Sequence, residues 1–182
     1  GGAVLGVTID KYCYVALHKS GQIWKCFDLP IRSGVATSSA FTVGLLRAST
    51  DFDKTVLVRL AVEWERDKSG GNVGHQDQYL CALGGMLNLK FCDQGVEVNP
   101  IDSNGLQDNL MLFYTGVRHT GSYDVIEEQL SNIKQTAPVL KEMHSLVYDG
   151  IDALDKGSEF GKLLDKTWGL KRKLAEHIST PE

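Results

Sequence analysis

The chain has 182 residues, of which 42% are hydrophobic and 23% charged, with a formal charge of −4 at pH 7. This length allows a substantial core, in one large or two small domains. The acidic balance argues against a nucleic-acid-binding surface. Residues 1–10 lack the features of a signal peptide or a membrane span. The four cysteines are irregularly spaced, which predicts reduced thiols in a cytoplasmic protein.

Strand patterns come first along the chain. Residues 3–17 are rich in Val, Ile and Tyr with partial alternation, which predicts one long or two short strands. Gly21 then allows a turn, and residues 22–27 are expected to form a returning strand. A helix is expected to start near Thr37 or Ser38, because hydroxylated residues are good N-caps.

A second helix is predicted over 54–67, where apolar residues recur at helical spacing. This spacing places Glu65 on or beside the opposite, polar face. The helix is expected to stop near residues 69–71, before a Gly-rich turn that contains Asp77.

The second half of the chain is expected to be mainly helical. Residues 86–101 indicate a hairpin with its turn at 93–95, and the apolar run 110–115 is typical of a buried strand. Three helices are then predicted, over 123–136, over 138–155 with Pro138 near its N-terminus, and over 158–178. The fold class is therefore α+β, and the order of the elements allows a division of the chain into two lobes.

The segment from Leu29 to Phe41, LPIRSGVATSSAF, has the composition of a phosphate-binding loop. A Gly followed by small and hydroxylated residues at a helix N-terminus leaves backbone N–H groups accessible to an anion, which the helix end favours. Its serines also suit plain helix capping, and the two uses are compatible. Taken alone, Glu65 is typical of a solvated surface residue and Asp77 of a local cap.

Several strings together resemble the GHMP kinase superfamily, most closely its D-glycero-D-manno-heptose 7-phosphate kinase branch. They are GGAVLGVTIDKYCYV, DLPIRSGVATSSAFTVGLL, NVGHQDQ, LMLFYTGVRHT and WGLKRKL. The resemblance implies a GHMP kinase-like two-lobed fold, which is incomplete here. Residues 1–105 would form the ATP-binding lobe, like domain 2 of ribosomal protein S5, and residues 106–182 a truncated, ferredoxin-like helical C-terminal lobe.

The resemblance also implies roles for particular residues. The family's phosphate loop corresponds to eight consecutive residues that would bind ATP: Arg32, Ser33, Gly34, Val35, Ala36, Thr37, Ser38 and Ser39. Ala36 replaces a glycine of the family pattern, which disfavours tight nucleotide binding. Ser38 and Glu65 match the ligands of Mg²⁺, and Asp77 matches the proposed catalytic base. Thr115 and Arg118 match a segment that would face the sugar.

Other family features are missing from the chain. The first motif is expected before residue 1 and the third after residue 182. Between His18 and Asp28 the family has several dozen residues, including part of the nucleotide pocket, where this chain has nine. A tight turn there would indicate a real deletion. Two hypotheses follow: an ATP-dependent sugar kinase with the anomeric hydroxyl of a heptose 7-phosphate as expected acceptor, or an incomplete, non-catalytic GHMP-like protein that binds a sugar phosphate or a partner chain.

Overall fold

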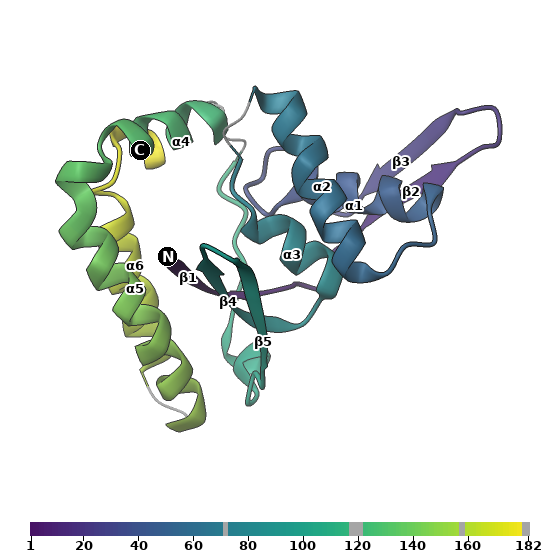
Figure 1. Ribbon diagram of the computed structural model, residues 1–182. Helices are drawn as coiled ribbons and strands as arrows, with labels where there is room; N and C mark the ends of the chain where they lie inside the picture. The colour runs from purple at the N-terminus through teal and green to yellow at the C-terminus, as the bar shows by residue number, and fades with distance from the viewer. Residues whose placement is uncertain (71–72, 117–121, 157–158, 180–182) are drawn as a thin grey trace. The chain divides into compact units, whose positions relative to one another are not determined.

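The computed structural model describes residues 1–70, 73–116, 122–156 and 159–179 (Figure 1). Its contacts divide the chain into two compact units, each made of segments that are distant in sequence. Unit 1 contains residues 1–6, 86–112 and 120–182, and unit 2 contains residues 7–85 and 113–119. Helices and strands are mixed along the chain, which confirms the predicted α+β class. The lobe boundary expected at residue 105 stays a prediction.

Unit 2 consists of a hairpin and three helices: β2 (Cys13–Leu17), β3 (Ile23–Phe27), α1 (Thr37–Ser49), α2 (Lys54–Ser69) and α3 (Gln76–Leu83). The two strands pair antiparallel, with Cys13 opposite Phe27. One face of the hairpin packs on α1, where a Cβ at Gly44 would lie 3.0 Å from Val15 Cγ2 and the Phe27 and Phe41 rings are 6.4 Å apart. Residues 3–17 thus contain parts of two short strands, β1 (Gly2–Val7) and β2, which is one of the two alternatives predicted.

The connection between β2 and β3 is a tight turn. The His18 backbone N–H donates to the Gln22 carbonyl at 2.8 Å, and Gly21 has a left-handed φ of 85° that suits glycine. The chain therefore passes directly from one strand to the next where the resemblance implied a long insertion.

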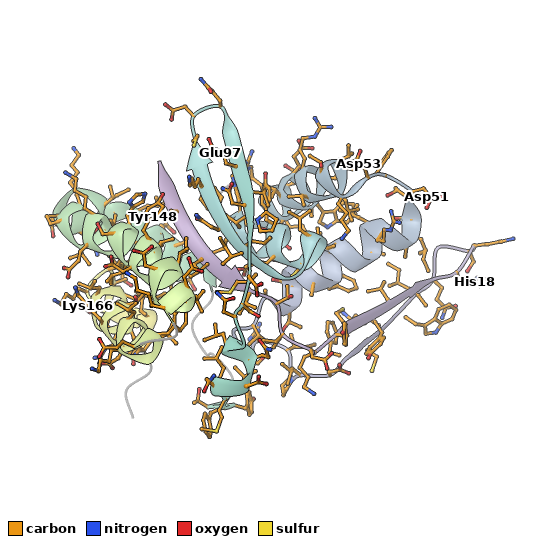
Figure 2. All side chains as sticks on the ribbon, turned by 90° about the horizontal axis from the view of Figure 1, so that it is seen from below. His18, Asp51, Asp53, Glu97, Tyr148 and Lys166 are labelled. Atoms are coloured by element: carbon orange, nitrogen blue, oxygen red, sulfur yellow. The ribbon has the colours of Figure 1, made fainter. Side chains whose placement is uncertain are left out.

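Three helices of unit 2 share a small apolar core. Val43 of α1 packs with Leu57 and Ala61 of α2, and Cys81 and Ala82 of α3 pack against this cluster. The start of α2 is fixed by Asp53 (Figure 2), whose carboxylate accepts the Thr55 and Val56 N–H groups at 2.8 and 3.1 Å. The core holds the N-terminal turns of α1 and α3 against the C-terminal half of α2.

Unit 1 contains a three-stranded sheet and a helical segment: β1 (Gly2–Val7), β4 (Met86–Cys92), β5 (Gly95–Ile101), η1 (Leu106–Asn109), α4 (Ser122–Ser131), α5 (Ile133–Lys156), α6 (Phe160–Lys171) and η2 (Glu176–Ile178). The strand order is β1-β4-β5, and β4 and β5 form the antiparallel hairpin predicted over 86–101. Met86, Leu106 and Leu154 form the core of this unit. Lys166 of α6 pairs with Glu142 of α5 at 2.9 Å.

Two predictions about the second half of the chain are wrong. Residues 110–115 form neither a strand nor a buried segment, and Met111 and Phe113 are 82% and 73% exposed. An apolar run indicates a buried strand only where other elements cover it. The helix predicted over 158–178 ends at Lys171, and a short 3₁₀ helix follows over Glu176–Ile178.

The position of Pro138 also differs from the prediction. Pro138 lies inside α5, because this helix begins earlier, at Ile133. Proline lacks the N–H that an interior helical residue donates, so it is better tolerated near a helix start. The start of α5 is supported by Thr136, whose hydroxyl donates to the Asn132 carbonyl at 3.0 Å.

Among the helices that the structure describes, none combines the length and the hydropathy that a membrane span requires.

The end of the described chain is attached to α4 through Glu128. The Glu176 backbone N–H donates to Glu128 Oε1 at 2.7 Å, and His177 Nδ1 lies 3.1 Å from Oε2. These contacts, the backbone N–H first, lower the pKa of Glu128 below its ordinary value of 4.5. Because the folded pKa lies below the unfolded one, the stabilisation is present above about pH 4.5 and is lost as the pH falls through the folded pKa.

Replacing Glu128 therefore has a pH-dependent effect. We expect Glu128→Gln to lower the free energy of unfolding at neutral pH, with a difference from the wild type that shrinks as the pH falls below 4.5. Urea denaturation at neutral and acidic pH measures this. Glu127→Gln, at an exposed position of the same helix, is the matched control. An effect of Glu128→Gln that is equal at both pH values would contradict the assignment.

Candidate active site

The loop before α1 has an alternating backbone conformation. Arg32, Gly34 and Ala36 have positive φ values of 66°, 81° and 56°, whereas the residues between them do not. Such alternation is typical of backbone nests, in which successive N–H groups face one concavity and bind an anion. The loop leads directly into α1, whose first N–H groups lack helical partners. This backbone geometry is compatible with anion binding, and the phosphate-binding role of residues 32–39 stays a prediction.

Ala36 is strained in this loop. It is the N-cap of α1 with φ 56° and ψ 29°, a left-handed conformation that disfavours any residue with a Cβ by roughly 1–2 kcal/mol. The structure therefore gives a physical reason for the glycine that the family pattern has at this position. The strain was visible in the sequence only as a departure from that pattern.

Restoring glycine is expected to stabilise the protein. Ala36→Gly removes the left-handed strain but adds flexibility to the unfolded chain, so we expect a net gain of roughly 0.5–1 kcal/mol in the free energy of unfolding. Urea denaturation measures it. Ala40→Gly, inside α1, is the matched control with the opposite expected sign, a loss of about 1 kcal/mol. Destabilisation by both substitutions would contradict strain at Ala36.

Three polar side chains meet at one end of the helical core. Ser39 lies four residues before Val43 on α1, Glu65 four residues after Ala61 on α2, and Gln78 four residues before Ala82 on α3. Residues four apart lie on the same helix face. Each polar residue therefore continues the buried stripe of its helix.

Glu65 is the centre of this cluster and is only 7% exposed. The Ser39 hydroxyl donates to Glu65 Oε2 at 3.1 Å, and the Gln78 amide Nε2 donates to the same oxygen at 2.8 Å. Glu65 Oε1 is also buried, and it has no hydrogen-bond partner among the residues that the structure describes. The prediction of a polar, outward face for Glu65 is thus wrong, because Glu65 extends the apolar stripe.

Asp77 lies in the first turn of α3, next to Gln78. Its negative charge and that of Glu65 both act on the Cys81 thiol, whose pKa is raised to about 12, mainly by burial and secondly by Asp77. Both predicted carboxylates therefore lie within electrostatic range of one side chain.

His75 stands at the N-cap of α3 and contacts α2. Its Nε2 lies 3.1 Å from Arg66 Nη2, and burial, followed by the Arg66 charge, lowers its pKa. A neutral His75 is thus favoured, and Arg66 supplies positive charge beside α3. The sequence prediction placed Asp77 in a Gly-rich turn, and α3 was not foreseen.

The other predicted site residues are not shown to contact Glu65 in the described part of the chain. Ser38 is exposed on the first turn of α1, and the hydroxyl that contacts Glu65 belongs to the next residue, Ser39. Thr115 is exposed in a segment without helix or strand, and Arg118 lies outside the described residues. The roles of Ser38, Thr115 and Arg118 stay predictions.

Gln78 is the site residue that the sequence prediction missed. It is the side chain beside Asp77 that touches Glu65, and it is 1% exposed. Its spacing of three and four residues to Cys81 and Ala82 would have revealed it, had residues 76–83 been recognised as a helix.

A divalent cation fits the chemistry of this cluster. Mg²⁺ prefers oxygen ligands and usually keeps several waters while binding one or two carboxylates and the phosphates of a nucleotide. Glu65 Oε1 is a buried carboxylate oxygen without a partner in the described part of the chain. Groups of three or more His, Cys, Asp or Glu that could hold a metal are absent from the same residues, so a site built on Glu65 depends on phosphate oxygens as well.

Comparison with known proteins gives a consistent result. Residues 12–85 match the family model of the GHMP kinases N terminal domain. The chain is 30% identical over 172 residues to a D-glycero-alpha-D-manno-heptose 7-phosphate kinase of Campylobacter jejuni, covering 85% of this chain and 50% of the relative. It is 28% identical over 173 residues to an L-fucokinase/L-fucose-1-P guanylyltransferase of Bacteroides fragilis, covering 84% of this chain and 18% of the relative.

A solved structure shares the fold of the chain. The crystal structure of a D-glycero-D-manno-heptose 1-phosphate kinase from Bacteroides thetaiotaomicron is similar with a TM-score of 0.60 and 22% identity, over 94% of this chain and 67% of that one. The chain spans about half the length of the first curated relative and a smaller share of the second. The resemblance to the GHMP kinase superfamily is thereby confirmed, and residues 12–85 match the N-terminal domain of this family.

Proposed function

We propose that the chain is part of an ATP-dependent sugar kinase that transfers the γ-phosphate of ATP to a sugar hydroxyl. The observation that carries the proposal is the buried carboxylate of Glu65, held by Ser39 at the N-terminal turn of α1. A carboxylate at the end of a phosphate-binding loop is the arrangement that a metal-bound nucleotide requires. The family match over residues 12–85 supports the same reaction class.

The loop is proposed to bind the phosphates of ATP. The N–H groups of residues 32–39 supply donors, and the left-handed residues turn them toward one side. The α1 N-terminus adds partial positive charge. Phosphoryl transfer demands mainly positioning and charge neutralisation, so a rigid backbone cradle contributes directly to the rate.

Ser38 and Glu65 are the proposed protein ligands of Mg²⁺. When bound, the ion neutralises charge on the phosphate oxygens and orients them. The role of Glu65 is to present a carboxylate oxygen at a buried position, where electrostatic interactions are stronger than in water. Ser38 is exposed on the first turn of α1, beside the residue that holds Glu65.

Asp77 is the proposed catalytic base. In this role its carboxylate accepts the proton of the attacking sugar hydroxyl as the oxygen bonds to phosphorus and ADP leaves. Its place in the first turn of α3, next to the Glu65 contact of Gln78, supports a position close to the phosphates.

The acceptor is proposed to be a sugar or sugar phosphate, with the anomeric hydroxyl of a heptose 7-phosphate as the first candidate. The name of the Campylobacter relative supports a heptose 7-phosphate, and that of the Bacteroides fragilis relative supports a kinase acting on another sugar. Thr115 and Arg118 are the proposed contacts to the sugar.

A second candidate function is a non-catalytic GHMP-like protein that binds a sugar phosphate or a partner chain. The tight turn from His18 to Gln22 favours it, because the resemblance placed part of the nucleotide pocket in the residues that this turn replaces. The strained Ala36 also disfavours nucleotide binding.

Calorimetry with MgATP separates the two functions. The kinase hypothesis requires nucleotide binding, and the alternative predicts none. A coupled assay of ATP consumption over a panel of sugars and sugar phosphates, with heptose 7-phosphate included, then tests the acceptor. Nucleotide binding without consumption of ATP on any acceptor would contradict the kinase proposal for this chain.

A further inference from the structure

Gln78 is a deeply buried amide that is only half satisfied. Its side chain is 1% exposed, and Nε2 donates to Glu65 Oε2 at 2.8 Å. Its Oε1 is buried and has no hydrogen-bond partner within the described ranges. Buried polar atoms in proteins nearly always have partners, and an exception needs an explanation.

The contact to Glu65 is selective for one carboxylate oxygen. Because a carboxylate accepts hydrogen bonds and cannot donate them, it is the amide nitrogen of Gln78 that must face it. Ser39 donates to the same oxygen, Oε2, from a different helix. Two donors from α1 and α3 therefore fix the rotation of the Glu65 carboxylate and leave Oε1 for another group.

We infer that Gln78 is a positioning residue that holds Glu65 Oε1 toward the divalent cation of the bound nucleotide. The inference rests on the proposed function, in which Glu65 is a ligand of that cation. Gln78 does not touch the cation in this scheme and acts through Glu65 alone. Partners that orient a metal ligand contribute typically 10- to 100-fold to metal affinity.

The test is the affinity for Mn²⁺, a paramagnetic substitute for Mg²⁺, in the presence of a saturating non-hydrolysable ATP analogue. Electron paramagnetic resonance of free Mn²⁺ reports the Kd without any turnover. Gln78→Met keeps the unbranched shape and removes the donor, and we expect its Kd for Mn²⁺ to rise roughly 10- to 100-fold. The Kd of the analogue without metal is expected to stay unchanged.

Three further variants sharpen the test. If Gln78→Met fails to fold, Gln78→Asn takes its place in the test. It keeps the amide but is one methylene shorter, so it is expected to weaken Mn²⁺ binding. In a Glu65→Gln background, Gln78→Met is expected to add no further loss, because it acts through Glu65. Gln135→Met, at an exposed position of α5, is the matched control and is expected to leave the Kd unchanged.

The outcomes separate this inference from the proposed function. A wild-type protein that binds Mn²⁺ with the analogue, together with Gln78 variants of equal Kd, overturns the positioning role and leaves the kinase proposal standing. A lowered melting temperature with an unchanged Kd also overturns it, because Gln78 is then structural only. A wild-type protein that binds no Mn²⁺ overturns the proposed metal site, and the role of Gln78 with it.

Discussion

Asp77→Asn is expected to lower kcat by roughly two to four orders of magnitude, the usual contribution of a positioned general base. The amide cannot accept the proton of the sugar hydroxyl, while its size leaves α3 intact. Binding of MgATP and the melting temperature are expected to change little. The measurement is a coupled assay of ATP consumption with the acceptor that the wild type accepts.

The control for this experiment is Asp51→Asn. Asp51 is exposed in the connection between α1 and α2 (Figure 2), beyond the C-terminal end of α1 and thus at the other end of that helix from Ser39. Its turnover is expected to equal that of the wild type. Wild-type turnover in Asp77→Asn would remove Asp77 from the role of base, whatever the control shows.

Glu65→Gln is expected to lower kcat by about 100-fold or more, because it removes the carboxylate proposed to bind Mg²⁺, and metal charge stabilisation amounts to several kcal/mol. The Gln side chain keeps the shape of Glu and an oxygen that accepts from Ser39 and Gln78. The fold is therefore expected to persist, and the concentration of Mg²⁺ needed for half-maximal activity to rise.

Glu63→Gln provides a matched control on the same helix. Glu63 lies two residues from Glu65, and it is exposed where Glu65 is buried. Its Mg²⁺ dependence is expected to match the wild type. If Glu65→Gln also shows the wild-type dependence on Mg²⁺, Glu65 is not a metal ligand, and its burial between Ser39 and Gln78 serves the fold alone.

Local patterns in the sequence were sufficient to locate several elements of both units. The start of α1 at Thr37 lies where it was predicted, although its N-cap is Ala36, without a side-chain cap hydrogen bond, and not a hydroxylated residue. The end of α2 near Gly70 followed from the glycines, and Gly70 has a left-handed conformation. The hairpin of β4 and β5 followed from alternation around a turn with glycine. These features depend on a few consecutive residues, so they can be predicted without knowledge of the tertiary contacts.

Other features depended on neighbours that are distant in the chain. The apolar run 110–115 has the composition of a buried strand, yet Met111 is 82% exposed, because burial depends on what covers a segment. The short helix α3 was missed, since eight residues after a Gly-rich stretch give little periodicity. Gln78 was missed with it.

The sequence by itself determined the family resemblance, the phosphate-loop composition of residues 32–39 and the choice of Glu65 and Asp77 as the proposed acids of the site. Only the tertiary structure decided that Glu65 is buried and that Ser39 and Gln78 hold one of its oxygens. The physical reason is that helical spacing shows which residues share a face, whereas packing of α1, α2 and α3 decides which faces meet.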